Sequence, residues 1–199
     1  MIFAKEGEKD YLAMFFKTST DIMTKEEMIS HLRPVPDFPV KGIKFWDITT
    51  LMKDAECLRA VVDDLYEEYK DKGITKVVGI ESRGFVIGPA LAARLGAGFV
   101  MARKMGKLPS DSLSETYTKE YGRDTIEIHK DAITEDDVCL LHDDLLATGG
   151  TMAACLRLVD KFHPVKSYMS FVIDIYDCPR IPEFPDDVPV YTVLKVSEK

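Results

Sequence analysis

The sequence lacks an apolar run long enough to cross a membrane. The densest apolar stretch near its start covers residues 11–16, far fewer than the roughly 20 residues that a spanning helix needs. No small-residue cleavage site follows this stretch, so a secretory signal is not expected either. We therefore expect a cytoplasmic protein without membrane partners, in which residues 1–23 are an extension in front of the folded domain.

Cysteine is scarce and is not arranged as a metal or redox site. The four cysteines include no C-x-x-C pair, which excludes zinc-ribbon and thioredoxin-like sites. The four histidines also lack the spacing of metal ligands, so no metal-binding residues are predicted. Cys139 and Cys155 fall in apolar runs and are expected to be small buried hydrophobic residues in a reducing compartment.

A surplus of positive charge is absent as well. The chain has 26 Lys and Arg against 34 Asp and Glu, a net charge of -8, whereas nucleic-acid-binding proteins present a basic face. A nucleic-acid partner is therefore not expected, although a small phosphorylated ligand needs only a few local cations and amides. The length of 199 residues suits one domain with its own core, at 24–199.

The sequence does contain strand-like segments that alternate with helix-like ones. Short apolar or alternating runs predict strands at 76–80, 98–103, 124–129, 138–143, 166–176 and 188–196. A capping box of Thr24 and Glu27 starts one helix, and helical spacing predicts others at 55–72 after Asp54, at 85–96 and at 151–162. The three prolines of 34–42 predict an irregular loop. This order predicts an α/β fold with a central, mostly parallel sheet flanked by helices.

Ligands of such sheets bind beyond the carboxyl ends of the strands. Three loops follow predicted strands, at 81–84, 103–109 and 142–151. We expect the functional site where these three loops meet.

The third loop contains a glycine-rich turn in the segment LLHDDLLATGGT, residues 140–151. It is not a Walker A loop, because no lysine follows Gly150, and it is not the G-x-G-x-x-G turn of dinucleotide-binding folds. Backbone amides at the start of a helix bind a phosphate group. The residues expected to supply them, with two threonine hydroxyls, are Ala147, Thr148, Gly149, Gly150 and Thr151.

The neighbouring acids Asp143 and Asp144 would repel that phosphate if they touched it. They can instead accept hydrogen bonds from a pair of vicinal hydroxyls, as the acidic residue of a dinucleotide-binding fold does with ribose. The predicted ligand is therefore a ribose 5-phosphate. The alternative is an aspartate pair that caps a helix beside a purely structural turn.

Five segments, in order, resemble the type I phosphoribosyltransferases, and most closely the adenine phosphoribosyltransferases among them. They are VPDFPVKGIKFWDIT, ESRGFVIGPALAARLG, RKMGKLP, YTKEYGRDTIEIHKDAI and DDLLATGGTMAA. The resemblance runs from about residue 24 to 193. It implies the type I fold, with a small N-terminal base-binding hood at about 34–50, and a homodimer. It also implies a reaction in which adenine and phosphoribosyl pyrophosphate give AMP and pyrophosphate, with Mg²⁺ bound mainly through the substrate.

The pyrophosphate would lie at the first two loops. Arg83 offers a bidentate cation, and the amides around Glu81 and Ser82 lie beside it. In the family that this sequence resembles, the peptide bond here, Glu81–Ser82, is often cis. Further positive charge comes from Arg103, Lys104 and Lys107. For those three side chains the alternative is a solvated basic turn.

The resemblance also assigns the chemistry and the base. Positive charge that grows on the sugar would be stabilised by Asp143 and Asp144. The segment 118–124 resembles a mobile catalytic loop, in which Glu120 would be the general acid or base and Tyr121 would close over the site.

The base pocket is expected around Phe38, Lys44 and Trp46, with backbone groups near the last two reading the base. His142 stands where the family usually has an aliphatic residue. We expect it to be half-buried and neutral.

Two alternatives remain at this point. One is a transferase of the same fold that acts on another base such as xanthine. The other is a non-catalytic regulator that senses phosphoribosyl pyrophosphate, although residues 1–33 are too short and too acidic for a helix-turn-helix.

Overall fold

A seven-stranded sheet forms the centre of the protein, in a computed structural model that describes residues 23–38, 40–119 and 122–198. The strand order is β5-β6-β4-β3-β7-β8-β9. The strands are β3 (Lys76–Ile80), β4 (Gly98–Lys104), β5 (Ser112–Lys119), β6 (Gly122–His129), β7 (Val138–Leu146), β8 (Lys166–Ile175) and β9 (Val190–Val196). The pairs from β4 through β3, β7 and β8 to β9 are parallel, whereas β5 and β6 run antiparallel. The predicted α/β fold with a mostly parallel sheet is confirmed.

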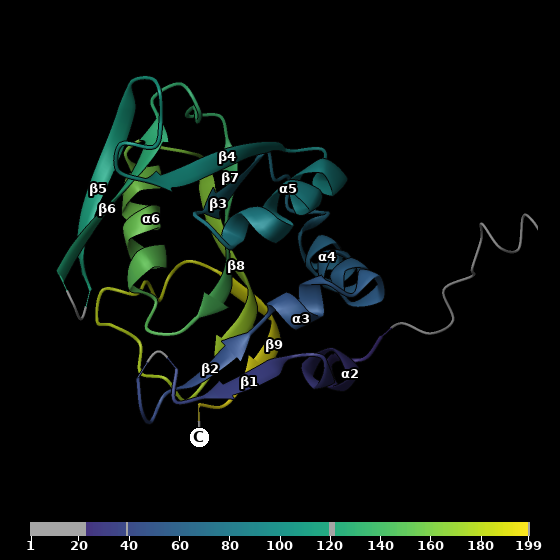
Figure 1. The fold of residues 1–199 in the computed structure, drawn as a ribbon. Coiled ribbons are helices and arrows are strands. Elements are labelled where there is room, and N and C mark those ends of the chain that lie inside the picture. Colours follow the sequence, from purple (N-terminus) through teal and green to yellow (C-terminus); the bar gives the residue numbers. More distant parts are fainter. Residues whose placement is uncertain (1–22, 39, 120–121, 199) are drawn as a thin grey trace, which may run out of the picture.

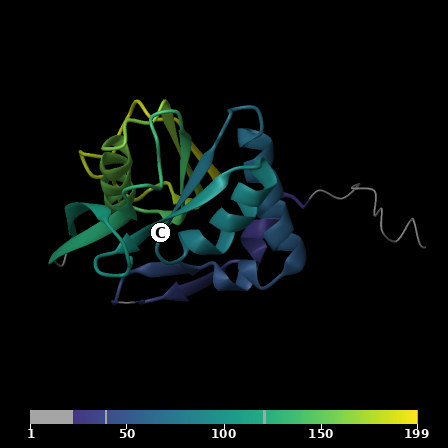
Figure 2. The same ribbon diagram turned by 90° about the horizontal axis from the view of Figure 1, so that it is seen from above.

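Helices cover both faces of this sheet (Figures 1 and 2). On one face lie α4 (Ala55–Tyr69) and α5 (Gly84–Leu95); on the other lie α6 (Gly150–Asp160) and the β5–β6 hairpin. Each face has its own core, because neighbouring residues of a strand point to opposite sides. In β7, for example, Leu140 packs with the α4 and α5 side, whereas Cys139 and Leu141 pack with the α6 side. Cys139 and Cys155 are fully buried, as the sequence predicts.

The helix starts follow their local signals. Thr24 caps α2 (Lys25–Ser30) through the expected capping box with Glu27, and Asp54 caps α4 by accepting from the amides of Glu56 and Cys57 at 3.0 and 2.9 Å. The strand β7 continues past its predicted end to Leu146, so both acids belong to the strand. No helix in the part of the chain that the structure describes is both long and apolar enough to span a membrane.

The prediction of an irregular loop at 34–42 is wrong for its first residues. Arg33–Pro36 forms β1, which pairs antiparallel with β2 (Lys44–Asp47) below the main sheet in Figure 1. Prolines are tolerated in this small sheet because it leaves each strand with a free edge, where a missing N–H breaks no ladder. Arg33 pairs with Asp47 at the far end of the register. A short helix, α3 (Thr49–Met52), then leads to α4.

The β5–β6 hairpin is the second difference from the sequence expectation. Only 124–129 was predicted as a strand, because SLSETYTK at 112–119 is mostly polar and lacks an apolar run. Its buried residue, Tyr117, packs on the α6 side of the sheet. On the same face of β5, Glu115 pairs with Arg157 of α6 and with Lys161, the C-cap of α6, at 2.8 Å each. Tertiary contacts with α6 therefore stabilise a strand that has little signal of its own.

Candidate active site

The three predicted loops do meet at one edge of the sheet, since β3, β4 and β7 are parallel neighbours that end there. The loop after β3 lies directly against β7. A Cβ atom on Gly84 would come within 2.6 Å of the carbonyl oxygen of His142. That oxygen belongs to the backbone and cannot turn aside as a flexible side chain would, so only glycine allows this approach. The Glu81–Ser82 peptide bond before it is cis, as the resemblance implies.

The acid pair lies at the centre of this edge. The Asp143 Oδ1 accepts a hydrogen bond from the Asp144 amide at 2.9 Å, and the Arg83 Nε lies 3.0 Å from the Asp144 Oδ2. Burial, and then the neighbouring Asp144, raise the pKa of Asp143 well above its ordinary value. Burial also raises the pKa of Asp144, while Arg83 opposes that rise. These carboxylates are therefore poorly solvated, and hydroxyl donors or developing positive charge would stabilise them.

His142 is completely buried, so the expectation of a half-buried ring is wrong. The residue lies in the middle of β7, between β3 and β8, where both faces of the sheet are covered. Its Nδ1 lies 2.9 Å from the Ser170 Oγ, and burial lowers the pKa of the ring to about 4. The expected neutral form agrees with this shift.

The glycine-rich turn adopts a conformation that requires Gly149. This residue, the N-cap of α6, has φ +83°, and a Cβ atom there would come within 2.3 Å of Phe184. Gly150 has no such constraint, because its nearest neighbour would lie 3.8 Å away. Thr151 is held by the Tyr117 hydroxyl, 3.2 Å from its own Oγ1. The turn thus delivers the amino end of α6 to the edge where the acids lie.

The sequence reasoning missed a fourth loop at this edge, the segment after β8. Arg180 donates to the carbonyl oxygen of Ala147 and pairs with Asp174, and the Ile181 amide donates to the Thr148 carbonyl at 2.9 Å. Through these contacts the segment after β8 holds the backbone of the glycine-rich turn in place. The sequence could have indicated this loop. A strand parallel to β7 must end at the same edge, and Arg180 follows the predicted strand at 166–176.

The basic residues of the second loop are not equivalent. Arg103 is held by Glu81, with Nε–Oε2 and Nη2–Oε1 distances of 3.2 and 3.3 Å, and it also donates to the carbonyl oxygen of Lys107 at 3.1 Å. The Lys104 amide donates to the same carboxylate, and Arg103 is the main cause that lowers the pKa of Glu81. The Glu81 side chain therefore positions Arg103, whereas the side chains of Lys104 and Lys107 are exposed.

Two packed phenylalanines lie next to Arg83 at this edge. The Arg83 Cζ lies 5.6 Å from the centroid of the Phe45 ring, and Phe38 packs edge-on against Phe45 at 5.2 Å. The Trp46 side chain does not join them, since its Nε1 donates to the carbonyl oxygen of Ser197 at 3.1 Å. The Lys44 Nζ lies over the Trp46 ring at 5.2 Å. The sequence analysis did not select Phe45. Neighbouring residues of a strand point to opposite faces, so Phe45 faces the other way from Lys44 and Trp46.

Two predicted site residues, Glu120 and Tyr121, lie outside the described residues. Residues 112–119 and 122–129, on either side of them, pair as the β5–β6 hairpin, and β5 packs on α6. Tyr117, buried and bonded to Thr151, anchors that hairpin beside the glycine-rich turn.

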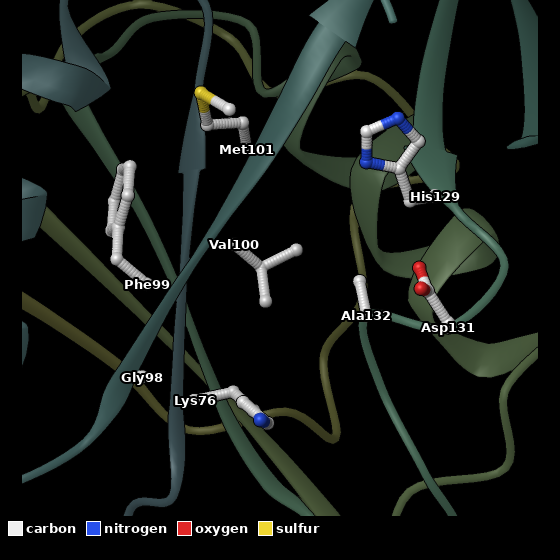
Figure 3. A pocket seen from close by; sticks show the side chains of 8 residues that line it. All are labelled: Lys76, Gly98, Phe99, Val100, Met101, His129, Asp131 and Ala132. Carbon is white, nitrogen blue, oxygen red and sulfur yellow. The ribbon is translucent and has the colours of Figure 1, made fainter. Parts of the chain in front are cut away.

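A separate cavity of about 290 Å³ lies along β4, away from this edge (Figure 3). Its lining includes the first residues of β3 and β4, Lys76 and Gly98, together with His129 at the end of β6 and Asp131 after it. It contains neither acid of the pair and no residue of the glycine-rich turn. The residues that fit a phosphorylated ligand are therefore those of the carboxyl edge.

Comparison with known proteins identifies the family. The sequence matches the phosphoribosyl transferase domain family over residues 50–197. This chain is a phosphoribosyltransferase-family protein. Adenine phosphoribosyltransferase of Phocaeicola vulgatus is 62% identical over 172 residues, which cover 86% of this chain and 99% of the relative. That of Bacteroides fragilis is 58% identical over 177 residues, which cover 88% and 99%.

Solved structures of the phosphoribosyltransferase family share the fold. The adenine phosphoribosyltransferase of Rhodothermus marinus superposes with a TM-score of 0.80 at 47% identity, covering 86% of this chain and 98% of its own. The Giardia lamblia enzyme, solved with 9-deazaadenine, gives a TM-score of 0.81 at 39% identity and covers 87% and 98%. The fold and the family that the sequence motifs indicate are thus confirmed.

Proposed function

We propose that this chain transfers the 5-phosphoribosyl group from phosphoribosyl pyrophosphate to adenine, giving AMP and pyrophosphate. The observation that carries the proposal is the position of Arg83. Its guanidinium contacts Asp144 of the acid pair on one side and lies over the Phe45 ring on the other. A ribose bound at the acids and a flat base bound near the ring would therefore meet beside one cation. The relatives named adenine phosphoribosyltransferase support the choice of base.

The sugar phosphate would be held by the glycine-rich turn. The amides of residues 147–151 lie where α6 begins, so the helix dipole and the free N–H groups both favour an anion. The ribose hydroxyls would donate to Asp143 and Asp144. As the bond to the leaving group lengthens, positive charge grows at the anomeric carbon, and these two carboxylates stabilise it in a poorly solvated place.

The leaving pyrophosphate would lie against Arg83 and the Ser82 amide. The expectation that the Glu81 amide also faces it is wrong, because that amide donates to the Ala102 carbonyl oxygen at 2.9 Å. Lys104 and Lys107 are exposed near it and add positive charge. Arg103 is oriented by Glu81 rather than free. Its role at the pyrophosphate therefore depends on keeping that ion pair.

Magnesium fits this site as an ion that the substrate carries. Asp143 and Asp144 present neighbouring carboxyl groups, and burial disfavours their ionised form by raising both pKa values. A cation would stabilise the ionised form, and carboxylate oxygens are ligands that Mg²⁺ prefers. When bound, Mg²⁺ stabilises negative charge on the departing pyrophosphate. The residues that would face it are the same two acids.

The base would bind between the small β1–β2 sheet and the acid pair, which makes that sheet the hood. Phe38 and Phe45 offer apolar ring surface, and the main chain near Lys44 and Trp46 offers groups for the edge of adenine. An activity panel with adenine, hypoxanthine, guanine, xanthine and orotate tests this choice. We expect at least 10²-fold preference for adenine in kcat/KM, and a preference for xanthine would favour the alternative transferase.

Glu120 is proposed as the general acid or base and Tyr121 as a residue that closes over the site. Glu120→Gln keeps the size of the side chain and removes the base, so the single-turnover rate should fall about 10²–10⁴-fold. Glu135→Gln, at an exposed position, serves as the control. A wild-type single-turnover rate in Glu120→Gln would assign the proton to water or to another acid.

We also propose a homodimer located in the cytoplasm. Exposed apolar side chains at Met101 of β4 and at Met105 within the basic loop 103–109 support an interface there. Light scattering at micromolar concentration should give the mass of two chains, and a fully active monomer would contradict this. The four free cysteines support a reducing compartment.

A further inference from the structure

Three potential metal ligands meet where α2 ends and α4 begins. They are His31, the C-cap of α2, Asp54, the N-cap of α4, and Cys57 in the first turn of α4. One ligand atom of each lies within 4.8 Å of the others. None of the three takes part in the proposed transfer reaction.

A fourth donor lies beside them. The Met23 Sδ is 3.5 Å from the Cys57 Sγ. The group therefore combines a thiol, an imidazole, a carboxylate and a thioether. These four atoms come from a segment before α2, the end of α2 and the start of α4, so their approach depends on the tertiary fold.

The surroundings suit a cation. Asp54 accepts both cap hydrogen bonds at Oδ1, so its other oxygen can face a cation without loss of the cap.

We propose that His31, Asp54 and Cys57 bind one zinc ion, which joins α2 to α4. Cysteine sulfur, histidine nitrogen and aspartate oxygen are the three ligand types that zinc takes in proteins. Tetrahedral bonds of about 2.0–2.3 Å place neighbouring ligand atoms roughly 3.3–3.7 Å apart. The present spacing of up to 4.8 Å closes to that range with small side-chain rotations. A water occupies the fourth position, and Met23 covers the sulfur side.

Zinc binding converts the buried thiol to a thiolate. Without metal, burial and the adjacent Asp54 raise the pKa of Cys57 to about 11. A coordinating cation removes this proton, which passes to solvent. The consequence of binding is structural, because α2 packs next to β9 and precedes the hood.

The test uses untagged full-length protein freed of metal by chelation. Co²⁺ should bind one equivalent per chain, with the visible bands of tetrahedral cobalt and a sulfur-to-cobalt charge-transfer band, and Zn²⁺ should displace it. A hundredfold excess of Zn²⁺ over its Kd should raise the Tm by roughly 5 °C or more. His31→Gln should weaken Zn²⁺ binding about 10–100-fold in competition with a chromogenic chelator.

Cys57→Ser should abolish the sulfur band, and the half-buried His31 gives an independent variant if Cys57→Ser does not fold. Cys178→Ser and His163→Asn, outside the cluster, should bind as the wild type does. Transferase activity should not change in His31→Gln. The proposal is overturned if the sulfur band is absent, if His31→Gln binds Zn²⁺ like the wild type, or if Cu⁺ binds more tightly and is lost with Met23→Leu.

Discussion

The Arg83 Nε lies 3.0 Å from the Asp144 Oδ2, so the one cation of the loop after β3 is already directed at the acid pair on β7. Arg83 lies in the loop after β3, as the N-cap of α5, whereas Asp144 lies in β7, so α5 and the whole β4–β5–β6 segment separate them in sequence. Their contact is possible because Gly84 lets that loop lie against the backbone of His142. It would couple the charge of the proposed sugar subsite to the cation of the proposed pyrophosphate subsite.

Arg83→Gln should lower kcat/KM by about 10²–10³-fold, because a charge-assisted contact and a cation at the leaving group are both removed. Arg83 lowers the pKa of Asp144 against the effect of burial. Its loss raises that pKa further, so the acidic limb of the pH–activity profile should move to higher pH. Steady-state kinetics across pH measures both effects. Arg94→Gln is the control, since Arg94 lies on the same helix but pairs with Asp63.

Asp143→Asn should reduce kcat by roughly 10²-fold and yet stabilise the ligand-free protein. The raised pKa of Asp143 means that the folded chain binds a proton more readily than the unfolded chain. Ionisation therefore removes stability as pH rises through the folded pKa, and asparagine cannot ionise. The variant should gain about 1 kcal/mol, or roughly 2–4 °C in Tm, at pH 8. The gain should disappear below the ordinary aspartate pKa, where both states are protonated.

Thermal unfolding of the ligand-free protein from acidic to alkaline pH measures this difference. Asp136→Asn, at an exposed position, is the matched control and should leave the Tm within error. A Tm gain that stays the same at every pH would mean that the acid pair is not strained by its charge.

Gly149→Ala should destabilise the protein by about 1–3 kcal/mol and weaken AMP binding. The new Cβ meets Phe184 at 2.3 Å, and φ +83° is unfavourable for alanine. Gly150→Ala, one residue later, meets nothing closer than 3.8 Å and should keep the wild-type Tm. Calorimetry of both variants decides the matter, and equal Tm values would show that the turn relaxes around the added methyl.

Tyr117→Phe should lower stability by about 1 kcal/mol and raise the KM for phosphoribosyl pyrophosphate a few-fold. The change removes the hydroxyl contact with Thr151 while the ring stays in the core. A double-mutant cycle with Thr151→Val should give a coupling of about 0.5–1.5 kcal/mol. Tyr176→Phe, at a largely exposed position, controls for loss of a hydroxyl. If the effects of the two changes on stability are additive, the hydroxyl contact does not link the hairpin to the glycine-rich turn.

The parts of the structure that depend on local signals could be predicted from the sequence. Thr24 and Asp54 predict the starts of their helices, and the apolar runs predict most of the parallel strands. Helix caps and buried strands need particular residue types at particular positions. The three loops of the site followed from the rule that ligands bind beyond the carboxyl ends of strands.

Other features depend on which segments meet in space, and no local sequence pattern predicts them. His142 is fully buried only because β3 and β8 lie on either side of β7. Arg180, after β8, reaches the carbonyl oxygen of Ala147, after β7, because these two strands are neighbours. The spacing of His31, Asp54 and Cys57 matches no metal motif, and only the fold brings the end of α2 to the start of α4.

Trp46 is the one tryptophan of the chain. Its indole is fixed to the Ser197 carbonyl and lies beneath the Lys44 ammonium, one residue from the ring that faces Arg83. Tryptophan fluorescence therefore reports from a single place, the small sheet proposed to hold the base. Binding of adenine can be followed without a label or a mutation, and a tag fused after residue 199 would sit next to the reporter.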